Sequence, residues 1–289
     1  MISRTQRHKI KRLLKAQCAQ WRMLALPFEI AFSMRMYQHR ALPGALVIGG
    51  QKCGTSSLYA YLEQHPQLAG VISHPSYPSG RWVEKEVHFF QQEERYERGE
   101  RWYRAHFHRP QPGVINFEAT PDYLTSVRSP SRVHALLPEA KLIVSLRDPV
   151  ARSFSAYQHT QRLNLSAESF RETLEREFRQ EGDPSVPRQN WDLLRKGRYA
   201  ESLERWFALY PREQFHIINF RDLAENPDAT VAGVVAFLGL PPAPLHTGHT
   251  HNPGRYSERM DADLETRLRE YYEPHNRRLE ALLGHPMGW

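Results

Sequence analysis

The sequence predicts an α/β fold of three layers, in which helices flank a central, mostly parallel sheet on both faces. Short apolar runs with the length of buried strands alternate along the chain with segments of helical periodicity. The first of these runs closes in glycines and leads directly into a helix, as the units of parallel sheets do. With 289 residues, of which 40% are hydrophobic and 11% aromatic, the chain can bury such a core and is not disordered throughout.

Four short runs are the predicted strands. Residues 45–49 are apolar up to their closing glycine, which suits a strand buried on both faces. Residues 141–146 combine Leu, Ile and Val in the same way. Residues 114–117 and 215–220 are shorter signals of the same kind, rich in Ile and Phe. Each run is followed by a turn or a helix, so the strands are expected to pair in parallel.

Helices are predicted between and after these strands by apolar residues at helical spacing. They are expected over residues 56–64, 170–180, 199–210, 228–238 and 261–283. Ser169 and Glu172 have capping-box spacing and mark the start of the second. Pro274 predicts a break in the last. Residues 72–82 and 241–256 are rich in turn residues and are predicted loops.

The chain shows no internal repeat and no clear linker, so we predict a single domain over residues 41–289. Residues 1–40 differ in character, because they carry nine of the 39 Lys and Arg residues and only one of the 32 acids. Apolar residues recur among these basic ones at helical spacing, namely Ile10, Leu13, Leu14, Cys18 and Trp21. We expect a basic amphipathic helix that either lies on an anionic membrane surface or packs on the domain.

Composition excludes several classes of protein. The net charge of +7 lies almost wholly in residues 1–40, so the nearly neutral remainder argues against a nucleic-acid partner. A mean hydropathy of −0.65 and the interruption of residues 23–34 by Pro27 and Glu29 argue against a membrane span or a cleaved signal. Cys18 and Cys53 cannot form a disulfide framework. We expect a cytoplasmic protein that is peripheral to the inner face of the membrane through residues 1–40.

The first motif is Gly49-Gly-Gln-Lys-Cys-Gly-Thr-Ser-Ser57, which joins the first strand to a helix. The main-chain N–H groups of such a turn, and those of the helix start, can cradle a phosphate. The spacing is nearly that of the nucleotide-triphosphate P-loop G-x-x-x-x-G-K-[ST], so the predicted fold is P-loop-like. Thr55 stands where that loop has its lysine, and Lys52 lies earlier, inside the turn. This pattern suits a phosphate with one cation beside it better than magnesium-dependent triphosphate chemistry.

The second motif is Arg147-Asp-Pro-Val-Ala-Arg-Ser-Phe-Ser155, which follows the strand over residues 141–146. Arg147 stands at the carboxyl end of that strand, where open α/β sheets bind ligands. Pro149 opens the next helix, which carries Arg152 and Ser155. An arginine fork with a hydroxyl suits a second phosphate.

Together the two motifs resemble the sulfotransferase family that uses 3′-phosphoadenosine 5′-phosphosulfate (PAPS) as its donor. The resemblance implies that the first motif binds the 5′-phosphosulfate through Lys52, Cys53, Gly54, Thr55, Ser56 and Ser57. It also implies that Arg147 and Ser155 bind the 3′-phosphate. The two motifs point to two phosphate sites on one ligand, which is more specific than either motif alone.

Further segments resemble the heparan-sulfate-type carbohydrate sulfotransferases, over roughly residues 45–284. Lys85-Glu-Val-His-Phe-Phe90 resembles their K-E-x-H-F-F segment, in which the glutamate is taken as the base. Other resembling segments are Glu118-Ala-Thr-Pro-Asp-Tyr123, residues 197–206, Gly254-Arg255-Tyr256 and residues 271–284. The resemblance implies that the loop with Arg255 closes over the nucleotide. The chain departs from the family pattern at Gln91, where an acid often stands, and at Ala119, where a lysine is common. It looks most like a soluble bacterial member.

Sulfuryl transfer needs a base near the acceptor and cations near the sulfonyl group. We predict Glu86 as the base and Lys52 as the cation beside the leaving group, with Lys85 and His88 assisting. In a strand, Glu86 and His88 would share a face. The expected acceptor is a carbohydrate or glycoconjugate hydroxyl, in preference to an amine. Two alternatives stay open: a P-loop-type nucleotide or small-molecule kinase, and a non-catalytic nucleotide- or saccharide-binding protein.

No metal cofactor is predicted. His106 and His108 are two residues apart, and a second group of histidines lies at residues 246–251. No cysteine and no H-E-x-x-H pattern accompanies either group.

Overall fold

The computed structural model describes residues 39–72, 85–181, 192–248 and 259–289. The predicted helix over residues 1–40 lies almost wholly outside these ranges. So do most of the loop predicted over residues 72–82 and the Gly254-Arg255-Tyr256 segment. Among the described helices, none is long and apolar enough to cross a membrane.

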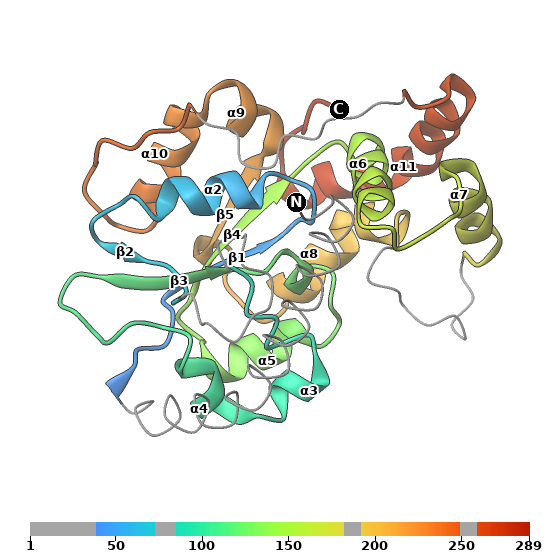
Figure 1. Cartoon of the computed structure of the whole chain (residues 1–289). Coiled ribbons are helices and arrows are strands. Elements are labelled where there is room, and N and C mark those ends of the chain that lie inside the picture. The colour runs from blue at the N-terminus through green and yellow to red at the C-terminus, as the bar shows by residue number, and fades with distance from the viewer. Residues whose placement is uncertain (1–38, 73–84, 182–191, 249–258) are drawn as a thin grey trace, which may run out of the picture.

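Five strands form one sheet in which every pairing is parallel. The strands are β1 (Ala45–Gly49), β2 (Leu68–Ala69), β3 (Ile115–Ala119), β4 (Lys141–Leu146) and β5 (Phe215–Asn219). Their order across the sheet is β2-β3-β1-β4-β5, so β1 lies at the centre (Figure 1). The four predicted strands are confirmed. β2 was not predicted, because a strand of two residues carries no readable periodicity.

Alternate side chains of β1 enter two different hydrophobic clusters, which shows directly that both faces of the sheet are covered. Ala45 and Val47 belong to the cluster formed with α2 (Thr55–Leu62) and α10 (Pro227–Phe237). Leu46 and Ile48 point the other way, into the cluster that contains side chains of α5 (Ser129–Leu136) and α8 (Tyr199–Phe207). The predicted three-layer α/β fold is therefore confirmed.

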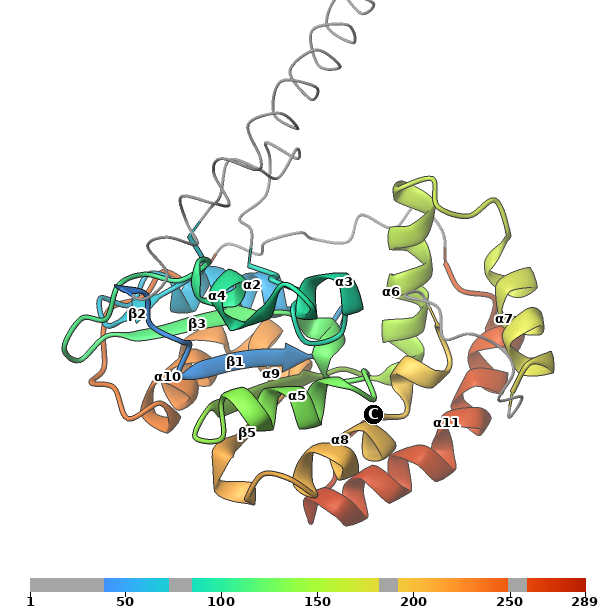
Figure 2. The same ribbon diagram turned by 90° about the horizontal axis from the view of Figure 1, so that it is seen from below.

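The remaining helices flank these layers. They are α3 (Glu93–Tyr96), α4 (Gly99–Arg104), α6 (Pro149–Arg162), α7 (Phe170–Arg179), α9 (Phe220–Glu225) and α11 (Ala262–Leu283). Figures 1 and 2 show α2, α9 and α10 together on one face, and α6, α7 and α11 grouped beside the sheet. A third hydrophobic cluster unites α6, α7 and α11. The capping box that Ser169 and Glu172 predict at the start of α7 is present.

The predicted break at Pro274 is wrong, because α11 runs through this residue. A proline inside a helix removes one main-chain hydrogen bond and is tolerated when packing holds both sides. Leu268 and Tyr272 are buried against α6 and α7 on one side of Pro274. Leu279, on the other side, is buried in the cluster that contains α8 side chains. These two anchors keep the helix continuous.

Candidate active site

The turn that follows β1 is held closely against β4. The Gly50 N–H donates to the Ser145 carbonyl at 2.6 Å, and the Ser145 hydroxyl donates to the Cys53 carbonyl at 2.6 Å. Gly54 has a φ of +79°, and a Cβ there would meet the Phe220 ring at 2.9 Å. Both the backbone conformation and the space therefore require glycine at this position.

The helix α2 begins at Thr55 with Gly54 as its N-cap residue, so no side chain caps it. The N–H groups of a helix start lack partners within the helix and suit an anion. Thr55 and Ser57 are buried, and Ser56 is half-buried. Cys53 is buried beneath the turn, 3.9 Å from the Tyr199 hydroxyl, and burial raises the pKa of its thiol. The Cys53 side chain therefore packs inside the protein and supports the turn.

Arg147 reaches this turn from the neighbouring strand. It follows the carboxyl end of β4, and its Nη1 donates to the Lys52 carbonyl at 3.4 Å. Its guanidinium lies 4.8 Å from the centroid of the Phe220 ring, and its own carbonyl accepts from the Tyr199 hydroxyl at 2.9 Å. Because β1 and β4 are adjacent and parallel, the two sequence motifs meet at one edge of the sheet.

Lys52 lies in a positive environment. Burial first, and then the charges of Arg162 and Arg147, together lower the pKa of its ammonium from 10.5 to about 8. Its backbone φ of +68° is left-handed. An ammonium held among other cations gains from any anion that enters, because the anion relieves this repulsion.

The two arginines of the second motif lie in different surroundings. Arg147 reaches the turn, whereas Arg152 is fully buried. The Nη2 of Arg152 donates to the Ser153 hydroxyl at 3.0 Å and to the Leu193 carbonyl. A guanidinium with no exposed surface cannot form an open anion site. Ser155, one helical turn further along α6, is also buried, with 2% of its surface exposed.

The segment with Glu86 and His88 is not a strand. Residues 85–88 are irregular, and His88 has a left-handed φ of +54°. The two side chains nevertheless meet, because His88 Nε2 lies 3.0 Å from Glu86 Oε2. Lys85 Nζ contacts Glu86 Oε1 and also donates to the Ala119 carbonyl at 3.3 Å. The contact between Glu86 and His88 that a strand would allow is therefore made in a different local structure.

Two basic neighbours set the ionisation of Glu86. Burial alone would raise the pKa of its carboxyl, but Lys85 and His88 outweigh burial and lower it to about 2. A third of the side chain still reaches solvent. Glu86 is therefore an ionised, partly accessible carboxylate across the physiological range of pH.

Gln91 defines the hydrogen-bonding state of His88. Its side-chain amide pairs with His88 Nδ1. The ionised Glu86 can only accept, so the His88 ring donates to it from Nε2 and is held by Gln91 at its other nitrogen. A departure from the family pattern thus helps to orient His88 toward Glu86.

Two side chains of α6 join this region without having been predicted. Burial, Lys52 and Arg162 lower the pKa of His159 to about 4, and Glu86 acts on the same group in the opposite direction. Arg162 Nη2 lies 2.8 Å from His159 Nδ1. The spacing of Ser155, His159 and Arg162 puts all three on one helical face. That spacing was the available signal, and it required knowing that α6 extends to Arg162.

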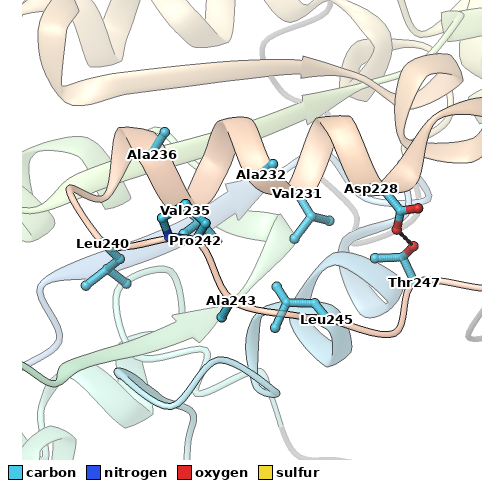
Figure 3. Close-up of a pocket in the computed structure, with 10 residues that line it drawn as sticks. All are labelled: Asp228, Val231, Ala232, Val235, Ala236, Leu240, Pro242, Ala243, Leu245 and Thr247. Carbon is cyan, nitrogen blue, oxygen red and sulfur yellow. Dashed lines mark hydrogen bonds between the residues drawn. The ribbon is translucent and has the colours of Figure 1, made fainter.

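Within the described ranges, no three His, Cys, Asp or Glu side chains gather as a metal site would require. A cavity of about 370 Å³ lies between α10 and residues 240–247 (Figure 3). Apart from Asp228 and Thr247, which are hydrogen-bonded at one end, its lining is apolar. It contains no Lys or Arg, so it does not suit an anionic ligand.

The fold and this arrangement define a class: an α/β protein with a cationic turn at the carboxyl edge of its sheet and an ionised carboxylate in the same region. Residues 42–266 match the family described as the sulfotransferase domain, and the chain therefore belongs to that family. It is a sulfotransferase, as the two motifs predict.

Relatives support the same assignment. The chain is 31% identical over 273 residues to heparan sulfate glucosamine 3-O-sulfotransferase 6 of Homo sapiens, a match that covers 86% of this chain and 74% of that protein. It is 30% identical to heparan sulfate glucosamine 3-O-sulfotransferase 3B1 of Homo sapiens, over 86% of this chain and 65% of that protein. The solved structure of a sulfotransferase from Alicyclobacillus acidocaldarius matches with a TM-score of 0.67 and 32% identity, over 85% of this chain and 97% of that chain.

Proposed function

We propose that this sulfotransferase moves a sulfuryl group from PAPS to a hydroxyl of a carbohydrate or glycoconjugate acceptor. The observation that carries the proposal is the meeting of Lys52 and Arg147 at adjacent strand ends, in the electrostatic neighbourhood of Glu86. Cations on one side and a carboxylate on the other are what sulfuryl transfer from a phosphate requires.

The donor would bind along the carboxyl edge of the sheet. In this proposal the turn and the start of α2 hold the 5′-phosphosulfate through Lys52, Gly54, Thr55, Ser56 and Ser57, while Cys53 supports the turn by packing within it. Arg147 holds the 3′-phosphate, and the part of Ser155 in holding it rests on the resemblance alone, because 2% of its surface is exposed. Arg255, with Gly254 and Tyr256, covers the nucleotide; this part rests on the sequence, since these residues lie outside the described ranges. The donor is a substrate, and no metal is proposed.

The proposed reaction is a single in-line displacement. Glu86 accepts the proton of the acceptor hydroxyl while that oxygen bonds to sulfur, and the bond between sulfur and the 5′-phosphate oxygen breaks. Lys52 stabilises the negative charge that develops on the departing phosphate. A carboxylate with a pKa of about 2 takes the proton only as the new S–O bond forms and the hydroxyl becomes acidic. Lys85 and His88 hold Glu86 in place.

The acceptor class is the least direct part of the proposal. The matched relatives bear names of heparan sulfate glucosamine 3-O-sulfotransferases, which favours a saccharide hydroxyl over an amine. Neither alternative from the sequence is favoured. Thr55 occupies the position of the P-loop lysine, which disfavours a kinase, and membership in the sulfotransferase family disfavours a non-catalytic role.

The test is release of 3′-phosphoadenosine 5′-phosphate (PAP) from PAPS by the purified protein, with a panel of saccharides that bear free hydroxyls or free amines. We expect release that depends on a hydroxyl-bearing saccharide. Release that requires a free amine would overturn the acceptor class. Absence of PAP binding, together with magnesium-dependent binding of ATP, would overturn the donor.

We also propose that residues 1–40 bring the otherwise nearly neutral protein to the anionic inner face of the membrane. The support is their charge, nine basic residues against one acid. In a flotation assay, vesicles that contain anionic lipid should carry the full chain upward with them but should not carry a chain that lacks residues 1–40. If both chains float equally, the membrane role is wrong, and packing on the domain is the remaining explanation for this segment.

A further inference from the structure

The segment that carries Glu86 and His88 touches the sheet through one main-chain hydrogen bond, in which the Ala119 N–H of β3 donates to the Lys85 carbonyl at 2.9 Å, and beyond it side chains hold the main chain. Three successive N–H groups donate to side chains. The Val87 N–H donates to Glu118 Oε2 at 3.2 Å, the His88 N–H to Thr120 Oγ1 at 3.4 Å, and the Phe89 N–H to the Tyr123 hydroxyl at 3.0 Å.

All three acceptors belong to one network around Glu118. Thr120 Oγ1 donates to Glu118 Oε2 at 2.6 Å, and the Tyr123 hydroxyl donates to Glu118 Oε1 at 3.0 Å. The Tyr103 hydroxyl donates to the same Oε1 at 2.6 Å. Glu118 therefore accepts four hydrogen bonds, and its side chain is completely buried at the end of β3.

This arrangement lowers the stability of the fold. A buried carboxylate costs free energy unless its oxygens are satisfied, and burial raises the pKa of Glu118 despite its four donors. His88 is held in a left-handed conformation that residues other than glycine adopt at a cost. Strained backbone conformations and buried charged groups of this kind cluster at functional sites. No other part of the proposed mechanism explains why an acid stands at this position.

We propose that Glu118 is a positioning residue for sulfuryl transfer: through Thr120 and Tyr123 it fixes three consecutive N–H groups and so aims the Glu86 carboxylate. It touches neither the donor nor the acceptor. The role as an aid to transfer rests on the proposed function, whereas the orientation of Glu86 can be measured without any substrate.

The test compares three variants. Glu118→Gln leaves one oxygen, so at most two of the four donors keep their acceptor. Thr120→Val removes the acceptor of the His88 N–H. Tyr103→Phe is the matched control, because it removes a buried hydrogen bond to Glu118 that involves none of the three N–H groups, and it keeps the ring that stacks on Phe89.

The first readout is the ionisation of Glu86, followed by ¹³C NMR of labelled glutamate carboxyls and assigned with Glu86→Gln. The groups that act on Glu86 are Lys85 and His88 on its own segment, and it interacts electrostatically with His159 on α6. At pH 4.5 Glu86 should be fully ionised in the wild type. In Glu118→Gln and Thr120→Val it should be partly protonated, because its pKa moves toward the ordinary value of about 4.3 once the pairing loosens. Tyr103→Phe should leave it ionised.

The second readout is kinetic. We expect kcat to fall about 10- to 100-fold in Glu118→Gln and Thr120→Val, as misplacement of a reacting group by a fraction of an ångström does. In Tyr103→Phe, kcat should fall only a few-fold. PAP affinity and the midpoint of thermal unfolding should be similar in all three variants. If Glu86 stays ionised in Glu118→Gln, or if Tyr103→Phe changes Glu86 and kcat as strongly, Glu118 has only a structural role. If Glu86 shifts as expected but PAPS is not used, the proposed donor fails and the positioning role stands.

Discussion

The two sides of the site are built in different ways. The proposed donor side, the turn after β1 with Arg147, is positioned by neighbouring strands and by the helix that follows at once. In the proposed acceptor side, residues 85–91, three N–H groups are held by side chains that lie 31 to 34 residues away in the chain. Because the two sides depend on different contacts, a variant on one side should leave the other intact.

The largest effect is expected for Glu86→Gln. Removing a general base costs about 10²- to 10⁴-fold in rate, because the acceptor hydroxyl then loses its proton without help. PAP affinity should be unchanged, because the donor side is intact. Rates of PAP release and calorimetry with PAP measure the two separately. Glu273→Gln is the control, since Glu273 pairs with a single arginine, Arg277, on the exposed face of α11. Turnover equal to the wild type in Glu86→Gln would refute the assignment of the base.

Arg147→Ala should show the opposite pattern, a donor defect. Loss of a charged hydrogen bond to phosphate costs roughly 1.5–3 kcal/mol, or about 10- to 100-fold in PAP affinity. Arg212→Ala is the control for loss of an arginine stacked on an aromatic ring, since Arg212 lies 4.4 Å from the centroid of Phe207. It should bind PAP like the wild type. If PAP affinity is unchanged in Arg147→Ala, the proposal that Arg147 binds the 3′-phosphate is wrong.

The contrast also explains what the sequence could and could not predict. The strand, glycine turn and helix over residues 45–62 are local signals, and they placed Lys52 and Arg147 correctly at one sheet edge. The local structure at Glu86 could not be predicted, because the partners of the neighbouring N–H groups are distant side chains, which periodicity does not encode. The second motif likewise does not reveal that the Arg152 side chain is buried.

A smaller and reversible effect is expected from pH on the donor side. The pKa of Lys52 is lowered to about 8, so its positive charge is lost as the pH rises through that value. In the proposed mechanism PAP binds the charged form, so its affinity should fall above about pH 8, by at most about tenfold per pH unit. Lys52→Arg keeps the charge and should hold the affinity level to about pH 9.5. A level affinity in the wild type across this range would show that Lys52 does not contact the phosphate.

The smallest effect is expected at Gln91, on the acceptor side. Gln91→Glu places a carboxylate at His88 Nδ1, where the wild type has an amide. The added carboxylate competes with Glu86 for the His88 ring, so Glu86 is held less well and kcat should fall roughly three- to tenfold. PAP affinity should stay level, because the proposed donor side is intact. Gln91→Met, which cannot hydrogen-bond strongly to the ring, separates loss of the amide from gain of charge: its kcat should fall less than that of Gln91→Glu. An equal loss in both variants would mean that Gln91 acts by packing alone, and that His88 and Glu86 are set only by the network around Glu118.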